Sequence, residues 1–161
     1  MPDSPTSDDA MLAESRILVV DDNAQNLELI VAYLDSLGVQ VDTACDGVEA
    51  LEKVQQVVYH LILLDIMMPK LSGFEVCPKL KSDPKTRDIP VIMVTALNEL
   101  TDIERAIASG TDDFVSKPVN RLELITRVKS LLRVSHLRNE LDRTLAYLQE
   151  VETRDTDEPS Q

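Results

Sequence analysis

The sequence has little positive charge and no long apolar run, and both shortages exclude classes of partner. Its 161 residues hold 16 Lys and Arg against 29 Asp and Glu, which gives a formal net charge of -13. Binding to DNA, RNA or anionic lipid needs a basic patch, so we predict no nucleic acid and no membrane partner. The longest apolar runs are also far too short to cross a bilayer.

Cysteine and histidine are scarce as well. Cys45 and Cys77 are the only cysteines and have no CxxC spacing, so we expect free thiols that are buried or half-buried. His60 and His136 are far apart and have no ligand partners near them in the sequence, which argues against a histidine metal site. No basic segment followed by an apolar one marks a signal peptide at the N-terminus. A cytoplasmic protein is the expectation.

From Ser15 onward, short apolar runs alternate with helical patterns, as in βαβ units around a parallel sheet. Runs 17–20, 61–64 and 91–94 are apolar throughout, as in strands covered on both faces, whereas 39–43 and 113–116 are mixed, as at sheet edges. We predict an α/β fold, a flavodoxin-like (βα)5 doubly wound parallel sheet with strand order 2-1-3-4-5. The expected strands are 16–21, 39–44, 60–65, 90–95 and 112–116.

Each expected helix also carries a start signal, a capping residue three positions before an acid or amide. Gly38 and Gly110 stand where the first and fourth helices should end in left-handed caps. The five capping residues are Asp22, Asp46, Ser72, Thr101 and Asn120.

Both ends of the chain are acidic. Residues 1–14 hold four acids and no base, so we predict a disordered acidic tail before a folded body at 15–133. Residues 153–161 are predicted to be a second disordered tail.

Between body and tail, Val134, Leu141 and Leu148 recur every seven residues. This spacing predicts that the last helix extends over 134–152 as a coiled coil. Fewer than three to four heptads are present, so folding back onto the chain's own domain is the alternative. Pairing with another chain is favoured, because the body has little uncovered core left.

Polar residues follow the expected strands: Asp21 and Asp22, Asp65, Thr95 and Lys117. In an open parallel sheet the carboxyl ends of the strands share one edge, where ligands bind. Carboxylates are the ligands that Mg²⁺ prefers, and a divalent cation relieves their mutual repulsion. A carboxylate beside the ion can attack a phosphoryl donor and form an acyl phosphate. Lys117 and Thr95 would stabilise the transferring oxygens.

The motifs at these sites resemble the receiver domain (REC) of bacterial two-component response regulators, and the resemblance runs from Ser15 to Arg133. It is carried by Asp21-Asp22, by Leu63-Leu64-Asp65-Ile66-Met67-Met68-Pro69 with Gly73, by Val94-Thr95-Ala96 and by Lys117-Pro118. One departure is Ser72, which stands where Asp often precedes the glycine.

The resemblance implies a role for each residue of the site. Asp65 would be the phosphoacceptor, and Mg²⁺ (or Mn²⁺) would be held by Asp22, by Asp21 largely through water, and by the backbone carbonyl of Met67. Thr95 would bind the phosphoryl group and move with it, and Lys117 would pair with a phosphate oxygen. The Lys117–Pro118 peptide bond is expected to be cis. Phe114 falls at the family's aromatic switch.

The resemblance also implies partners. A sensor histidine kinase or phosphotransfer protein would supply the phosphoryl group, and the chain would be a signalling module rather than a turnover enzyme. A homodimer is expected, since Arg105, Asp113, Glu123 and Arg127 resemble the salt-bridge set on the dimer face of some receiver domains.

Two other functions are open. One is a receiver-fold scaffold that acts by protein contacts without phosphorylation. The other is a phosphohydrolase with an aspartyl intermediate, although Ile66-Met67 lacks the second acid of its D-x-D motif.

Overall fold

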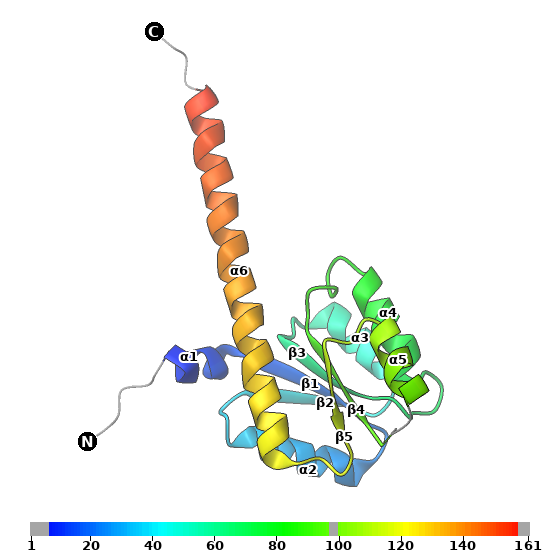
Figure 1. Cartoon of the computed structure of the whole chain (residues 1–161). Coiled ribbons are helices and arrows are strands. Elements are labelled where there is room, and N and C mark those ends of the chain that lie inside the picture. Colours follow the sequence, from blue (N-terminus) through cyan, green and yellow to red (C-terminus); the bar gives the residue numbers. More distant parts are fainter. Residues whose placement is uncertain (1–6, 97–99, 158–161) are drawn as a thin grey trace, which may run out of the picture.

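The computed structural model describes residues 7–96 and 100–157 and has three layers, a five-stranded sheet with helices on both faces (Figure 1). All strands are parallel in the order β2-β1-β3-β4-β5, which confirms the predicted fold, and every strand end lies within one residue of its predicted place. The strands are β1 (Arg16–Val20), β2 (Gln40–Ala44), β3 (Leu61–Asp65), β4 (Val91–Thr95) and β5 (Asp113–Ser116). The helices are α1 (Ser7–Glu14), α2 (Ala24–Asp35), α3 (Gly47–Gln56), α4 (Gly73–Ser82), α5 (Leu100–Ala108) and α6 (Arg121–Asp157).

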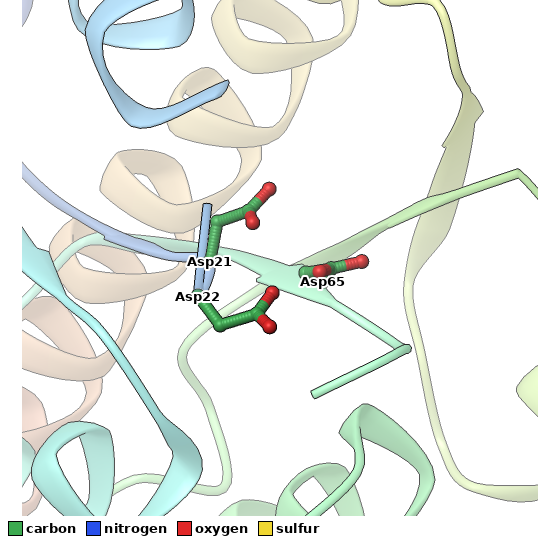
Figure 2. A group of neighbouring side chains, drawn as sticks. All are labelled: Asp21, Asp22 and Asp65. Atoms are coloured by element: carbon green, nitrogen blue, oxygen red, sulfur yellow. The ribbon is translucent and has the colours of Figure 1, made fainter. Parts of the chain in front are cut away.

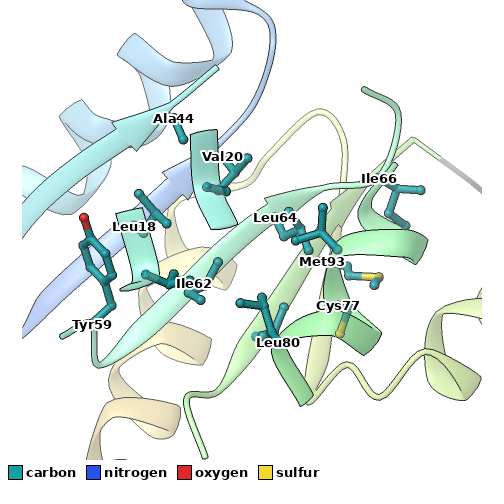
Figure 3. Packing of buried hydrophobic residues seen from close by; sticks show 14 of the residues in the cluster. Leu18, Val20, Ala44, Tyr59, Ile62, Leu64, Ile66, Cys77, Leu80 and Met93 are labelled. Carbon is teal, nitrogen blue, oxygen red and sulfur yellow. The ribbon is translucent and has the colours of Figure 1, made fainter. Parts of the chain in front are cut away.

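The central strands bury side chains on both faces because successive residues point to opposite sides of the sheet. Leu18, Ile62 and Met93 pack under α3, α4 and α5 in the cluster that Figure 3 shows. Ile17 and Leu63, one residue away, pack with α2 and α6 on the other face. This double burial explains why the central runs are continuously apolar.

The predicted helix starts are partly confirmed. The Asp46 carboxylate accepts the Glu49 N–H at 2.8 Å, the Asn120 side chain accepts the Glu123 N–H at 3.0 Å, and α4 begins directly after Ser72. The Asp22 prediction is wrong, because Asn23 caps α2 by accepting the N–H groups of Gln25 and Asn26.

Three other local predictions have clear outcomes. Thr101 lies inside α5 rather than before it. Gly38 and Gly110 have the predicted positive φ, 79° and 94°. Cys77 is buried as expected, but Cys45, in the short connection between β2 and α3, is exposed.

The predicted N-terminal disorder is wrong for Ser7–Glu14, which forms α1. Leu12 is only 3% exposed and joins the cluster under α2 and α6, while Asp8 pairs with Arg133 at 2.6 Å. One buried leucine in an acidic octapeptide leaves no helical periodicity to detect. Residues 1–6 lie outside the described residues.

Helix α6 begins on the sheet and then leaves it. Leu124, Val128 and Leu132 are fully buried, whereas Leu137, Leu141 and Leu148 are 64%, 57% and 51% exposed. The apolar stripe therefore does not fold back on the body, and the helix projects well beyond it (Figure 1). It continues through Asp157, so the disorder predicted from residue 153 is wrong up to that point, and residues 158–161 lie outside the described part. None of the described helices is long and apolar enough to span a membrane.

Candidate functional site

Three carboxylates meet at the carboxyl edge of the sheet. Asp65 ends β3, and Asp21 and Asp22 follow β1 directly, where Val20 pairs with Leu64 (Figure 2). One oxygen from each of the three side chains lies within 4.8 Å of the others. The parallel register therefore assembles the acidic set that the sequence predicted.

The three acids differ in burial. Asp21 is 1% exposed and Asp65 is 3% exposed, whereas Asp22 faces solvent. Asp21 is held by β2 and by its own turn, since its N–H donates to the Ala44 carbonyl at 3.1 Å and its carboxylate accepts the Asn23 N–H at 2.9 Å. Because Asn23 caps α2, Asp22 is not needed as a cap and can serve as a ligand.

Lys117, which directly follows β5, brings a positive charge to the three acids. Its Nζ lies 3.2 Å from Asp65 Oδ1 and 3.4 Å from Asp21 Oδ2. Its backbone N–H donates to the carbonyl of Thr95 at 2.7 Å, which ties the end of β5 to the end of β4. Thr95 is 5% exposed at this edge. The Lys117–Pro118 bond is cis, as predicted.

The crowding of acids has an electrostatic cost. Burial, followed by the charge of Asp21, raises the pKa of Asp65 to about 6, although Lys117 and the Met67 N–H act in the opposite direction. A single lysine thus does not neutralise the site. A set of hard carboxylate oxygens with excess negative charge fits Mg²⁺, which binds one or two carboxylates and keeps several waters.

The loop after Asp65 is held close by Gly73. A Cβ on Gly73 would lie 2.7 Å from the Asp65 carbonyl oxygen and 2.8 Å from Ile66 Cα, so only glycine lets α4 start this near to β3. Within the loop, the Met67 N–H donates to Asp65 Oδ1 at 3.4 Å. The role of the Met67 carbonyl as a metal ligand stays a prediction.

Phe114 and the predicted dimer residues are not part of the acidic set. Phe114 is half-buried against the cluster under α3, α4 and α5. Arg127 binds both oxygens of Asp113 at 2.7 Å and Glu123 at 3.4 Å, all within one chain. Arg105 is separate from this set, because its guanidinium lies 4.3 Å from the centre of the Phe74 ring.

Sequence reasoning missed two features. Asn23 was hidden by the adjacent acids, although an Asn two positions before an amide or acid is itself a capping signal. His60 and His136 stack at the opposite edge of the sheet with ring centres 5.2 Å apart. They are 76 positions apart, so no local pattern could have joined them.

Comparison with known proteins agrees with this geometry. The sequence model of the response regulator receiver domain family matches residues 17–129. The chain is 45% identical over 127 residues to the response regulator PleD of Caulobacter vibrioides, which covers 79% of this chain and 28% of PleD. It is 41% identical over 118 residues to the DNA-binding dual master transcriptional regulator RpaA of a Synechocystis strain, covering 73% of this chain and 49% of RpaA. The chain thus spans less than half the length of these relatives.

Solved structures give the same picture. A CheY-like response regulator receiver domain protein from Methanospirillum hungatei superposes with a TM-score of 0.72 at 29% identity and covers 77% of this chain and 98% of that one. The receiver domain of a sensor histidine kinase from Pseudomonas aeruginosa superposes with a TM-score of 0.69 at 31% identity, and the match covers 73% of this chain and 97% of that domain. That structure has a magnesium ion coordinated in its active-site cleft.

Proposed function

This chain belongs to the response regulator receiver domain family, a family of signalling modules, and we propose that it accepts a phosphoryl group on Asp65 in a Mg²⁺-dependent reaction. The observation that carries the proposal is the meeting of Asp21, Asp22 and Asp65 with Lys117 at one sheet edge. The donor would be a sensor histidine kinase or a phosphotransfer protein, and the setting is the cytoplasm.

The transfer is a substitution at phosphorus. A carboxylate oxygen of Asp65 attacks the phosphorus of the donor, and an O–P bond forms as the bond to the donor nitrogen, or to the acyl oxygen of a small acyl phosphate, breaks. The leaving group keeps the electron pair. The ionised carboxylate is the nucleophile, and because the pKa of Asp65 is about 6, most of the acid is ionised at neutral pH.

The surrounding residues hold the reacting groups. Asp21 and Asp22, with the Met67 carbonyl, would hold the ion, which when bound neutralises charge on the transferring oxygens. Lys117 Nζ, 3.2 Å from Asp65 Oδ1, would pair with a phosphoryl oxygen. Thr95 would donate its hydroxyl to another, and the shift of Thr95 and Phe114 would alter the α5–β5–α6 surface.

The proposal is tested by the intact mass of the chain after incubation with acetyl phosphate and Mg²⁺. The wild type should gain one phosphate, and neither Asp65→Asn nor the wild type without the metal should gain any. Asp46→Asn, which changes a half-buried acid that caps α3 outside the site, is the matched control and should be labelled normally. If the wild type stays unlabelled with acetyl phosphate and with an active kinase, the phosphorylation-independent scaffold is the better function.

Phosphorylation would favour a homodimer. Support comes from Asp113, Glu123 and Arg127, a self-complementary set of charges on the β5–α6 surface, and from the exposed stripe of α6 with Val134, Leu141 and Leu148, which would pair as a coiled coil. Sedimentation velocity with and without acetyl phosphate measures the effect. An unchanged mass on full phosphorylation counts against it.

A further inference from the structure

The two surfaces assigned to the dimer share one helix face. Helix α6 is unbroken from Arg121 to Asp157, so heptad positions can be counted along it from the sheet into the projecting stem. The first heptad position is taken by Arg127, Val134, Leu141 and Leu148, and the fourth by Glu123, Ser130, Leu137, Thr144 and Val151. The charges near the sheet thus stand in the same frame as the leucines of the stem.

Resting on the proposed dimer, we infer that α6 pairs with α6 of a second copy along a single parallel, in-register seam from Glu123 to Val151. The buried residues Leu124, Val128 and Leu132, which pack α6 against the sheet, occupy the fifth, second and sixth heptad positions and leave the seam positions less covered. Glu123 and Arg127 are half-buried, and Ser130 is exposed. In the stem, Val134 and Leu137 are 52% and 64% exposed on the seam side.

Length favours one seam over a stem that pairs alone. The apolar part, Val134 to Val151, is about two and a half heptads long, below the three to four that sustain a coiled coil. Including Glu123, Arg127 and Ser130 extends the heptad frame to about four heptads, and these charged and polar positions add contacts that fix register rather than apolar burial. Pairing between the β5–α6 surfaces and pairing between the projecting parts of α6 would therefore stabilise each other. A change at the β5–α6 surface would then alter pairing along the stem.

The residues at the start of the seam, Glu123 to Ser130, favour a parallel over an antiparallel pair of α6 helices. Arg127 occupies a first heptad position but is neutralised by Asp113 and Glu123 of its own chain, so two such arginines can face each other. A polar residue at such a position fixes register at a cost in stability. In an antiparallel pair centred on Leu141, Ser130 would instead face Glu152, and the foot would lie against the stem's tip.

The surface beside Glu123 and Arg127 is hollowed. A hollow of about 610 Å³ lies between β5 and the first turns of α6, lined by Leu122, Thr126 and Ser130 among others. Leu122 is 75% exposed there. A parallel partner brings its own first turns to this hollow, whereas an antiparallel one brings the acidic end of its stem.

Cysteine cross-linking of the full chain tests orientation and extent together. In a Cys45→Ser background, we expect Ser130→Cys, Val134→Cys and Leu148→Cys each to form a disulfide-linked dimer under mild oxidation in the presence of acetyl phosphate, because facing seam positions lie within disulfide reach. Ala146→Cys, exposed on the far side of the stem, is the matched control and should not link.

Two results overturn the inference. If a mixture of the Val134→Cys and Leu148→Cys chains links mainly to each other, the pair is antiparallel. If Leu148→Cys links but Ser130→Cys does not, the seam stops at the stem. The mass of the Asp65 adduct, measured in the same samples, keeps the two proposals apart: normal labelling without links refutes the seam alone, and absent labelling refutes the phosphoacceptor.

Discussion

Asp65→Asn should stabilise the metal-free fold. The carboxylate of Asp65 is 3% exposed, shares its site with Asp21 and lies 3.2 Å from the Lys117 ammonium. Its pKa of about 6 against an ordinary 3.8 means that folding opposes its ionisation. Asparagine has nearly the same shape as aspartate but no charge, so Asp65→Asn removes the free-energy cost of burying an ionised carboxylate.

The sign and size follow from linkage. A carboxyl whose pKa is raised by folding loses proton binding on unfolding, so it lowers stability as pH rises through the interval from 3.8 to 6, and the full cost is present above 6. A rise of roughly two pH units corresponds to about 3 kcal/mol. At pH 7.5 the variant should therefore be more stable than the wild type by about 3 kcal/mol, and at pH 4.5 by only about 1 kcal/mol.

Urea unfolding followed by far-UV circular dichroism in EDTA measures both values. Asp22→Asn is the matched control: it removes an exposed acid of the same site and should have a much smaller effect. Saturating Mg²⁺ should stabilise the wild type more than Asp65→Asn, since the ion relieves the same repulsion. Equal stability of wild type and Asp65→Asn at pH 7.5, or a gap that fails to narrow at pH 4.5, would refute the electrostatic account of the site.

Two further substitutions test the left-handed backbone of Lys70 and the contacts of His60, which directly precedes β3. Lys70 has a φ of 69°, so Lys70→Gly should raise the free energy of unfolding by about 0.5–1 kcal/mol, whereas Lys70→Ala, which keeps the left-handed strain, should not; urea midpoints decide. His60 Nδ1 accepts the Arg16 N–H at 3.0 Å, and burial, then the nearby His136, lowers the pKa of His60. The stabilisation of the fold by neutral His60 is fully present above the ordinary histidine pKa of about 6.5 and is lost as pH falls below that value. His60→Asn keeps the acceptor without titrating, so it should lose less stability than the wild type between pH 7.5 and 5.5; equal losses would contradict the assignment.

The sheet and its acidic edge could be predicted because both follow from local patterns. Continuous apolar runs such as Leu61–Leu64 identify central strands, and parallel register then requires Asp21 and Asp65 to meet. No long-range information is needed for this step, since the topology itself brings the strand ends together. The capping of α2 failed for the opposite reason: Asp21, Asp22 and Asn23 are all good capping residues in sequence, and only the hydrogen bonds assign the role to Asn23.

The contacts at the point where α6 leaves the sheet could not be predicted, because they join residues that are distant in sequence and belong to no recognisable motif. Arg133 pairs with Asp8, His136 stacks on His60, and the Ser15 hydroxyl lies 3.0 Å from His136 Nε2. Ser15 donates its single proton to the Met11 carbonyl at 2.7 Å, so His136 Nε2 must be the donor to Ser15. The ring is thereby fixed against α1 and the start of β3. We expect a helix held by these contacts where it leaves the sheet to move with the body, so that a shift at the β5–α6 surface would be transmitted along the projecting part of α6.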